Sequence, residues 1–193
     1  MTQAPSPGSL PPLRPAGAKR ACACLVLALL LSCAGLARAE SIQVYFSPNG
    51  GCTDAILKQV NQARTEILIQ AYSFTSKPIA RALIQAHKRG VKITALLDKS
   101  NRTQKYSAAT FLKHMDIPVF IDDKHAIAHN KIMLIDNRVV ITGSFNFTAG
   151  AESKNAENLL ILEDMPDLTR AYRDNFFQHL RHSVAYRGPE DSP

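Results

Sequence analysis

The stretch HNKIMLIDNRVVITGSFN, residues 129–146, decides the fold predicted for this chain. It contains two apolar, β-branched runs, NKIMLI and RVVIT, which are typical of β-strands. Asp136 and Asn137 stand between the two runs, and both residue types are common in tight turns. The pattern therefore predicts a β-hairpin.

Polar side chains gather at the open end of this hairpin. His129 and Lys131 are two positions apart, so on an extended strand their side chains point to the same face. Gly143, Ser144 and Asn146 follow the second strand, where the chain leaves the sheet and can bend around a ligand. The imidazole is a candidate nucleophile or proton carrier, and the ammonium, hydroxyl and carboxamide can bind phosphate oxygens.

These residues resemble a known motif. HNKIMLID followed by TGSFNFT resembles the HKD motif of the phospholipase D superfamily, and the run TGSFNFTAGAESKNAENLLIL, with AYSFTS earlier in the chain, is similar to the small bacterial endonucleases of that superfamily. The likeness extends from about Ser41 to Arg181. It implies a phospholipase D-like α/β/α sandwich and a reaction in which His129 attacks phosphorus to give a phosphohistidine, which water then hydrolyses.

The residues of the motif have distinct predicted roles. Neutral imidazole is a nucleophile near neutral pH, and a covalent intermediate divides one difficult displacement into two easier steps. Lys131, Ser144 and Asn146 are predicted to stabilise charge on the pentavalent transition state, with a purely turn-forming hydroxyl as the alternative for Ser144. Gly143 is predicted to allow a close approach of the backbone.

Two acidic residues are predicted to act differently. Asp136 lies an odd number of positions from both His129 and Lys131, which places it on the opposite face of a regular strand and favours a turn or buried-pair role over proton transfer. Glu157 opens the apolar run ENLLILE. In the superfamily the matching glutamate lies near the catalytic histidine, so the resemblance implies that Glu157 orients an imidazole by a hydrogen bond.

A metal site is an alternative raised by Asp122, Asp123 and His125, which precede the motif. Their spacing is typical of a loop, the chain has no CxxC pair, and the resemblance implies catalysis without metal, with lysines in the role that magnesium has elsewhere. We therefore predict neither a cofactor nor a metal. The remaining histidines fall in segments of helical pattern and are expected to face solvent or the core edge: His87, His114, His179 and His182.

Residues 1–39 differ in composition from the rest of the chain. A Pro-rich start and Lys19-Arg20 precede the apolar run of residues 21–37, which ends in Ala37-Arg38-Ala39. This order of basic, apolar and A-x-A segments predicts a secretory signal peptide and a periplasmic or secreted protein. An uncleaved membrane anchor and a lipoprotein, with residues 30–33 as a loose lipobox, are the alternatives.

Loss of this leader changes the charge and the cysteine content. The chain carries a formal charge of +7, but four of its 23 basic residues and none of its 16 acidic residues precede Glu40, which leaves 19 basic against 16 acidic residues, or +3. Such a mild excess is not that of a dedicated nucleic-acid-binding protein, so any affinity for DNA depends on where the charges lie. Cys52 is the one cysteine left, either as an unpaired thiol or in an intersubunit bond.

Strands and helices alternate along residues 40–187, which we predict to form one domain before a disordered tail of residues 188–193. Besides the hairpin, strands are predicted at 42–46, 66–72, 91–98, 117–121 and 157–163, and helices at 54–64 (with Thr53 as N-cap), 78–90, 104–115 and 166–182. The pattern indicates an α/β fold, a mixed β-sheet flanked by helices on both faces. Ligands bind such open sheets at the strand ends.

The single motif predicts a dimer. The double displacement needs a nucleophile and a separate acid for the leaving oxygen, yet no second His-x-Lys occurs in the sequence. Longer members of the superfamily carry two motifs. We therefore predict a C2 homodimer in which each subunit contributes one His129 to a shared site.

The predicted function is a metal-independent phosphodiesterase that cuts DNA, with RNA as a further substrate, without sequence preference. A groove for the nucleic-acid backbone is predicted from four basic residues, for which a solvated helix face is the alternative: Lys99, Arg102, Lys105 and Lys113. The competing hypotheses are a phospholipase D-type lipid phosphodiesterase, held at a membrane by an uncleaved leader, and an inactive nucleic-acid-binding protein. The intact set of His129, Lys131 and Glu157 argues against the inactive protein.

Overall fold

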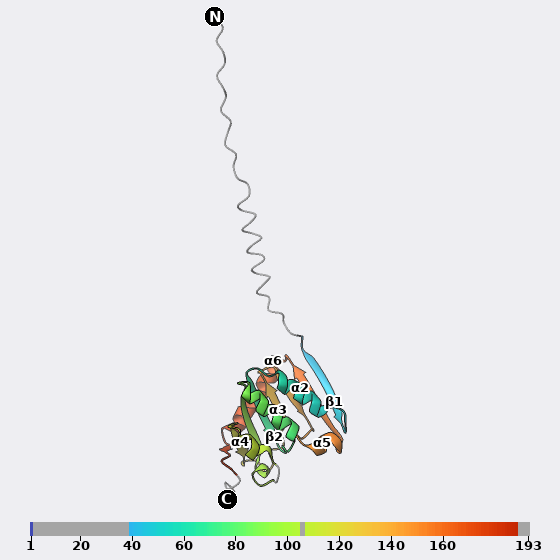
Figure 1. Cartoon of the computed structure of the whole chain (residues 1–193), viewed down its shortest axis with the longest axis vertical. Helices are drawn as coiled ribbons and strands as arrows, with labels where there is room; N and C mark the ends of the chain where they lie inside the picture. The colour runs from blue at the N-terminus through green and yellow to red at the C-terminus, as the bar shows by residue number, and fades with distance from the viewer. Residues whose placement is uncertain (2–38, 105–106, 189–193) are drawn as a thin grey trace. The chain divides into compact units, whose positions relative to one another are not determined.

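The computed structural model describes residues 1, 39–104 and 107–188. The chain divides into two units, residues 1–38 and 39–193, and the fold below is that of the second unit (Figure 1). Most of the predicted leader and tail, and Lys105, lie outside the described residues. Among the described residues, no helix combines the length and the apolar composition that a bilayer span requires.

The second unit alternates strands and helices. In chain order the elements are β1 Ser41–Ser47, α2 Cys52–Gln62, β2 Glu66–Ala71, α3 Lys77–Lys88, β3 Lys92–Asp98, the 3₁₀ helix η1 Lys99–Arg102, α4 Ala108–Lys113, β4 Val119–Asp122, β5 Lys131–Ile135, β6 Val139–Gly143, α5 Ala149–Ser153, β7 Glu157–Glu163, α6 Pro166–Leu180 and β8 Val184–Ala185.

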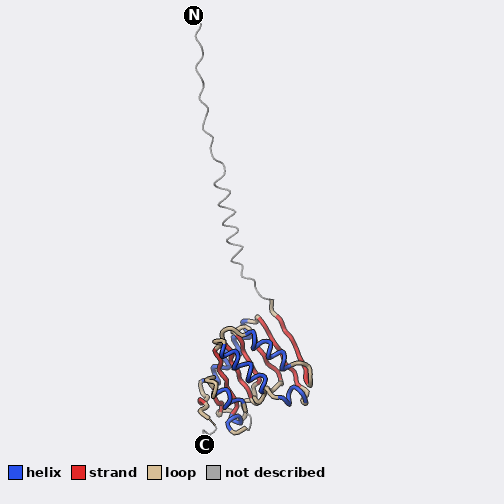
Figure 2. Tube along the Cα trace, viewed as in Figure 1, coloured by secondary structure: helices blue, strands red, loops and turns tan. Residues whose placement is uncertain are grey.

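The strands form one mixed sheet in the order β1-β7-β6-β5-β2-β3-β4-β8 (Figure 2). Strands β2, β3 and β4 run parallel, and the other pairs are antiparallel. The register places Ala71 at the end of β2 opposite Lys131 at the start of β5, and Asp98 at the end of β3 opposite Asp122 at the end of β4. The polar residues of the motif therefore lie at the same end of the sheet as the carboxyl ends of the parallel strands, which is where ligands bind in open α/β sheets.

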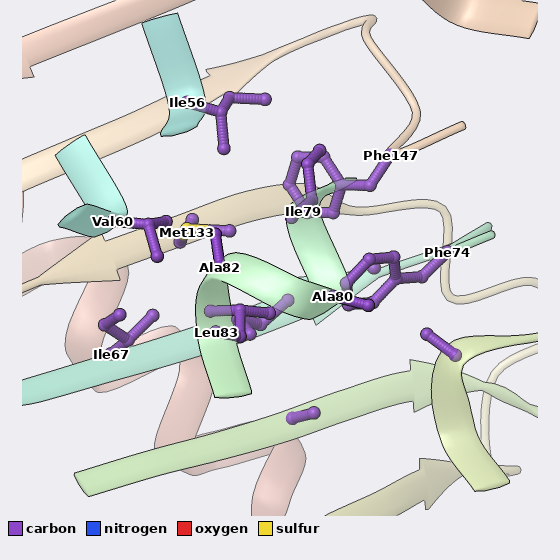
Figure 3. Packing of buried hydrophobic residues seen from close by; sticks show 14 of the residues in the cluster. Ile56, Val60, Ile67, Phe74, Ile79, Ala80, Ala82, Leu83, Met133 and Phe147 are labelled. Atoms are coloured by element: carbon purple, nitrogen blue, oxygen red, sulfur yellow. The ribbon is translucent and has the colours of Figure 1, made fainter. Parts of the chain in front are cut away.

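The two faces of the sheet are covered unequally. On one face, Ile56 and Val60 of α2 and Leu83 of α3 pack over sheet residues such as Ile67 and Met133 (Figure 3). On the other face, Phe176 of α6 packs over a smaller cluster that includes Leu68, Leu96, Ile132, Leu134 and Val140. Apolar residues of β2 and β5 are buried on both faces, as central strands between two helical layers require. The predicted mixed sheet with helices on both faces is confirmed.

Strand β1 lies at the edge of the sheet and leaves part of the α6 face uncovered. Ile42, Val44 and Phe46 are 60%, 52% and 63% exposed. Their cross-strand partners on β7 include Leu162, which packs against the cluster under α6, so these three side chains share that face. The edge is thus an exposed apolar stripe.

Several local predictions are wrong. Helix α2 begins at Cys52 with Gly51 as its N-cap, so Thr53 lies inside the helix, and the carboxylate of Glu152 accepts hydrogen bonds from the Gly51 and Thr53 amides in place of a local cap. The helix predicted at 104–115 is only the short α4, which Ser107 caps, preceded by η1. Helix α5 and strand β8 were not predicted.

Of the two alternatives predicted for Cys52, the structure agrees with the unpaired thiol. Cys52 is free and 0% exposed, so its sulfur cannot reach a second subunit in this fold.

Candidate active site

The hairpin that carries the motif forms as predicted. Met133 pairs with Ile141 and Ile135 with Val139, and the chain reverses between them. Asp136 and Asn137 have φ values of 55° and 52°. They are the two central residues of a tight turn that the Arg138 amide closes by donating to the Ile135 carbonyl (3.0 Å). Both lie in the left-handed region, which Asp and Asn tolerate better than most residues.

Asp136 has a structural role at the far end of this hairpin from His129. Its carboxylate accepts hydrogen bonds from the amides of Arg64 (2.9 Å), Thr65 (2.8 Å) and Glu66 (3.1 Å) and from the Thr65 hydroxyl (2.9 Å). Burial by itself raises the pKa of Asp136, but the hydrogen bonds outweigh burial and hold the pKa below its usual value. Asp136, the aspartate of the HKD motif, thus links the hairpin turn to the start of β2.

His129 and Lys131 meet Tyr72 where β2 ends beside β5. The Tyr72 amide donates to the Asn130 carbonyl (2.7 Å), which extends the pairing of the strands past Ala71. The Tyr72 ring lies 4.6 Å from the imidazole of His129, and the ammonium of Lys131 lies 5.1 Å from the same ring. His129 is exposed and no carboxylate hydrogen-bonds to it within the described residues, so its ring is accessible to a ligand.

Lys131 is 7% exposed and its ammonium donates to the His129 carbonyl (2.8 Å). Burial lowers the pKa of Lys131, and the negative charge of Glu157 raises it in part. The Glu157 carboxylate accepts from the Asn155 side chain (3.0 Å), and the expected hydrogen bond from an imidazole to Glu157 is not formed within the described part of the chain. In this structure Glu157 therefore acts on Lys131, through its negative charge, and not on an imidazole through a hydrogen bond.

Alternating side chains anchor the run after β6. Phe145 and Phe147 are fully buried, whereas Ser144 is exposed and Asn146 is half-buried. Phe147 forms a parallel bridge with Phe74, and their rings meet edge to face at 5.8 Å. The two buried rings fix the loop to the core, which leaves Ser144 exposed and Asn146 partly exposed beside the site.

The backbone around Ser144 is tightly packed. Gly143 has φ of 143°, and a Cβ atom there would lie 2.2 Å from the Asn158 carbonyl oxygen, so no other residue fits without a shift of backbone. The Ser144 hydroxyl accepts a hydrogen bond from the Asn158 amide (3.0 Å), which leaves its own proton for a further acceptor. The Oδ1 atom of Asn146 is buried and has no hydrogen-bond partner within the described residues, so it is an unsatisfied acceptor.

A groove of about 440 Å³ opens beside these residues, between the hairpin and α6. Of the predicted site residues it brings together His129, Lys131 and Gly143; Ser144, Asn146 and Glu157 lie outside its lining. Sequence reasoning missed Tyr72, which the AYSFTS run contains, and the groove residues of α6, for which no sequence signal exists because the packing of α6 places them. The lining is formed by His129, Asn130, Lys131, Ile132, Thr142, Gly143, Ala171, Tyr172 and Asn175.

The other basic residues and histidines lie elsewhere. The Lys99 ammonium donates to the His125 carbonyl (3.1 Å), and Arg102 forms an ion pair with Asp123 (3.1 Å), so both hold the loop after β4 and do not line the groove. His179 and His182 do not simply face solvent or the core edge as expected, because both meet the buried carboxylate of Asp122.

Comparison with known proteins agrees with the fold and the motif. A model of the family described as cardiolipin synthase, PLD-like domain, matches residues 56–180. The chain belongs to the phospholipase D superfamily. It is 46% identical over 137 residues to a phospholipase D of Rickettsia conorii, covering 71% of this chain and 68% of that protein. The crystal structure of Nuc from Salmonella typhimurium, a phospholipase D family member, matches 78% of this chain and all of its own, with a TM-score of 0.75 and 36% identity.

A more distant relative is the mitochondrial cardiolipin hydrolase of Danio rerio, 32% identical over 124 residues, which cover 64% of this chain and 54% of that protein. The predicted superfamily is thereby confirmed, and the protein is a phosphodiesterase of that superfamily.

Proposed function

We propose that the protein is an endonuclease that hydrolyses DNA, with RNA as a further substrate, through a phosphohistidine intermediate at a site shared by two subunits. The observation that carries this proposal is the exposed imidazole of His129 beside the buried ammonium of Lys131 in an open groove. None of the groove's lining residues carries a carboxylate, the ligand type by which proteins hold Mg²⁺. Lys131 is therefore the group that meets the charge of the phosphodiester.

The reaction follows from these groups. An imidazole nitrogen of His129 attacks phosphorus, and the bond to the leaving oxygen breaks as that oxygen takes a proton from the partner subunit's His129. Water then attacks the phosphohistidine, gives its proton to the partner subunit's His129, and releases a phosphate monoester and free His129. Lys131 and the hydroxyl proton of Ser144 stabilise the negative oxygens in both transition states.

The uncovered part of the α6 face supports a dimer. Ile42, Val44 and Phe46 form an exposed apolar stripe on the same face as Ile132 and Thr142 of the groove. Contiguous exposed apolar residues of this kind mark interaction surfaces. A two-fold axis beside β1 buries the stripe and brings two grooves together.

Nuc supports the nucleic-acid substrate, because its name suggests such a substrate for that protein and its full length matches this chain. A lipid phosphodiesterase is the second candidate. It is favoured by the names of the Rickettsia conorii and Danio rerio relatives and by the apolar stripe on β1, which a lipid surface can also contact. The two candidates share one chemistry and differ in substrate.

The test compares the full chain with His129→Asn and with the control His114→Asn, a change at the C-cap of α4. Each protein is given plasmid DNA or vesicles of phosphatidylcholine and cardiolipin, with excess EDTA, at a temperature well below unfolding. We expect DNA cleavage in the wild type and His114→Asn and at least about 10⁴-fold less in His129→Asn. Lipid hydrolysis without DNA cleavage would assign the second function, and equal activity in His129→Asn would remove His129 from the mechanism.

Mixing wild type and His129→Asn tests the shared site. If each reaction needs both histidines, mixed dimers are inactive, and an equal mixture retains about a quarter of the activity instead of a half. Retention of half would show that each subunit acts alone.

A further inference from the structure

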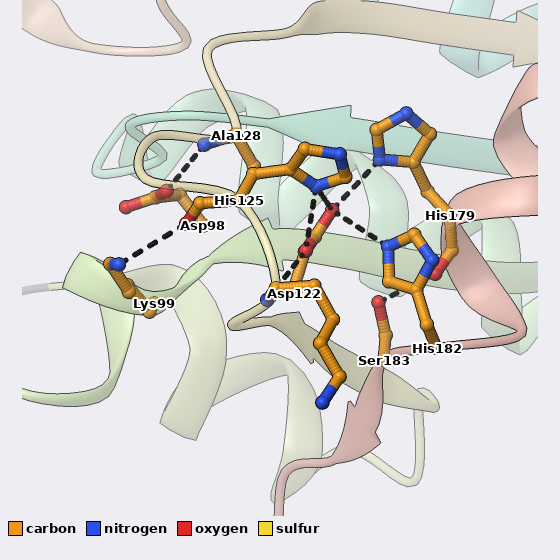
Figure 4. A network of polar contacts seen from close by, with 9 residues as sticks. Asp98, Lys99, Asp122, His125, Ala128, His179, His182 and Ser183 are labelled. Carbon is orange, nitrogen blue, oxygen red and sulfur yellow. Dashed lines mark hydrogen bonds and ion pairs between the residues drawn. The ribbon is translucent and has the colours of Figure 1, made fainter.

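A cluster of three histidines surrounds one buried carboxylate at the end of β4 (Figure 4). Asp122 is 0% exposed. Its Oδ2 atom lies 2.8 Å from Nδ1 of His179, 2.9 Å from Nδ1 of His125 and 3.4 Å from Nε2 of His182. Three imidazole nitrogens thus converge on a single oxygen.

The fold brings these residues together from two distant segments. His125 follows Asp122 by three positions in the loop after β4, whereas His179 lies in the last turn of α6 and His182 three positions later. The His125 ring stacks on that of His179 at 4.6 Å, and His182 is tilted against both at 5.2 and 5.4 Å. One candidate ligand atom from each of the four residues lies within 4.8 Å of all the others.

The donor set is that of a transition-metal site. A neutral imidazole has one N–H, so a metal-free cluster requires all three rings to present that N–H to one carboxylate, of which His125 reaches both oxygens (3.1 and 2.9 Å). A divalent cation instead takes the lone pairs of the three nitrogens and of the carboxylate. Tetrahedral Zn²⁺ with bonds of about 2.0–2.1 Å sets its ligand atoms about 3.3 Å apart. The oxygen–nitrogen separations are 2.8, 2.9 and 3.4 Å, and all four ligand atoms lie within 4.8 Å of one another, so small side-chain shifts bring them to that spacing.

We propose that Asp122, His125, His179 and His182 form a Zn²⁺ site. Three nitrogen ligands favour zinc over Ca²⁺ or Mg²⁺, which prefer oxygen. Four protein ligands close the coordination sphere, as in structural zinc sites.

The site connects two parts of the catalytic groove. The loop that carries His125 ends at His129, and α6 carries Tyr172 and Asn175 of the groove lining. The same loop is held at the Ala128 amide by Asp98 (2.8 Å) and at the His125 carbonyl by Lys99 (Figure 4). Zinc therefore fixes the loop before the nucleophile to the helix across the groove, and its role is structural, separate from the phosphohistidine chemistry.

The first test measures zinc directly. The full chain, purified without a histidine tag, is stripped with dipicolinate and titrated with ZnCl₂ against a chromophoric chelator, and its metal content before stripping is measured by mass spectrometry. We expect one zinc per chain, a higher melting temperature with zinc, and at least a 100-fold loss of affinity in His179→Gln. The control His114→Gln should bind as the wild type does.

A second test uses Co²⁺ with the wild type alone, and so does not depend on the folding of His179→Gln. Co²⁺ added to the stripped wild type should give the intense visible bands of a tetrahedral ion, and Zn²⁺ should abolish them. Absence of those bands, no shift of the melting temperature with zinc, unchanged affinity in His179→Gln, or weaker zinc binding in His114→Gln would each overturn the site. Because DNA cleavage by His129 is measured separately under EDTA, failure of one proposal leaves the other standing.

Discussion

Histidines occupy two contrasting settings at the same end of the sheet. His129 is exposed, lies against Tyr72 and has no carboxylate hydrogen-bonded to it within the described residues. The imidazoles of His125, His179 and His182 all face one buried carboxylate. A ring without such a partner has a nitrogen free to attack phosphorus. In the three rings that contact Asp122, one nitrogen is already occupied by the carboxylate.

The two settings also differ in the buried charged residue that lies beside the rings. In the groove, the buried ammonium of Lys131 is the group that we propose to meet the negative charge of a substrate. In the cluster, the buried carboxylate of Asp122 faces three imidazoles of the protein itself. Substitutions in the groove should therefore change the rate of cleavage. Substitutions of Asp122 and Asp136, whose carboxylates hold distant segments together, should change the free energy of unfolding.

After His129→Asn, the largest effect is expected from Lys131→Gln. Loss of the ammonium removes charge stabilisation from both transition states, and kcat should fall about 10³-fold. Stopped-flow and steady-state kinetics on DNA measure the loss, with thermal melting as the control for folding. A change confined to KM would show that Lys131 only binds the substrate.

Asp136→Ala should mainly affect stability. It removes charge-assisted hydrogen bonds to three amides and places alanine at φ of 55°, so the free energy of unfolding should fall by about 3 kcal/mol. Because the folded pKa of Asp136 lies below its unfolded value, this stability is present above about pH 4 and is lost as pH falls through the folded pKa.

Urea unfolding of wild type and Asp136→Ala between pH 7 and pH 3 measures both effects, with Asp136→Asn as a variant that tolerates the same backbone. The two stability curves should converge toward acid. A parallel pair of curves would show that Asp136 does not stabilise through its charge.

Asp122→Asn should lower the free energy of unfolding by about 2 kcal/mol even with chelator present, because three imidazoles then lose their charged partner. At temperatures below unfolding, cleavage per folded molecule should change less than tenfold. A loss of cleavage as large as that of Lys131→Gln would show that the cluster takes part in catalysis, as His129 is proposed to do.

The smallest effect is expected from Glu157→Gln. The negative charge of Glu157 raises the pKa of Lys131, so its removal lowers that pKa further and moves the alkaline limb of the pH–rate profile to lower pH. The activity at neutral pH should fall only several-fold. An unchanged alkaline limb would separate Glu157 from Lys131, and a shifted acid limb would restore the predicted contact with an imidazole.

Local patterns made much of this fold predictable. Alternation of apolar runs with turn residues indicated the hairpin, and the odd spacing of Asp136 from His129 excluded it from the face of Lys131. The N-terminus of α2 was misplaced because Glu152, about a hundred positions away, satisfies the amides that a local cap would satisfy. Long-range partners of this kind leave no trace in the spacing of nearby residues.

The superfamily and the residues of the motif could be read from the sequence because they depend on short spacings along one hairpin and the run that follows it. The mixed sheet could be read from the alternation of strand and helix patterns over residues 40–187. The surroundings of these residues depend on how distant segments of the chain pack together. The packing of α6 against the sheet brings Tyr172 to the groove and joins His179 and His182 to Asp122. The physical reason is that side-chain periodicity fixes which face a residue occupies, whereas the angle and end point of a packed helix depend on the whole core beneath it.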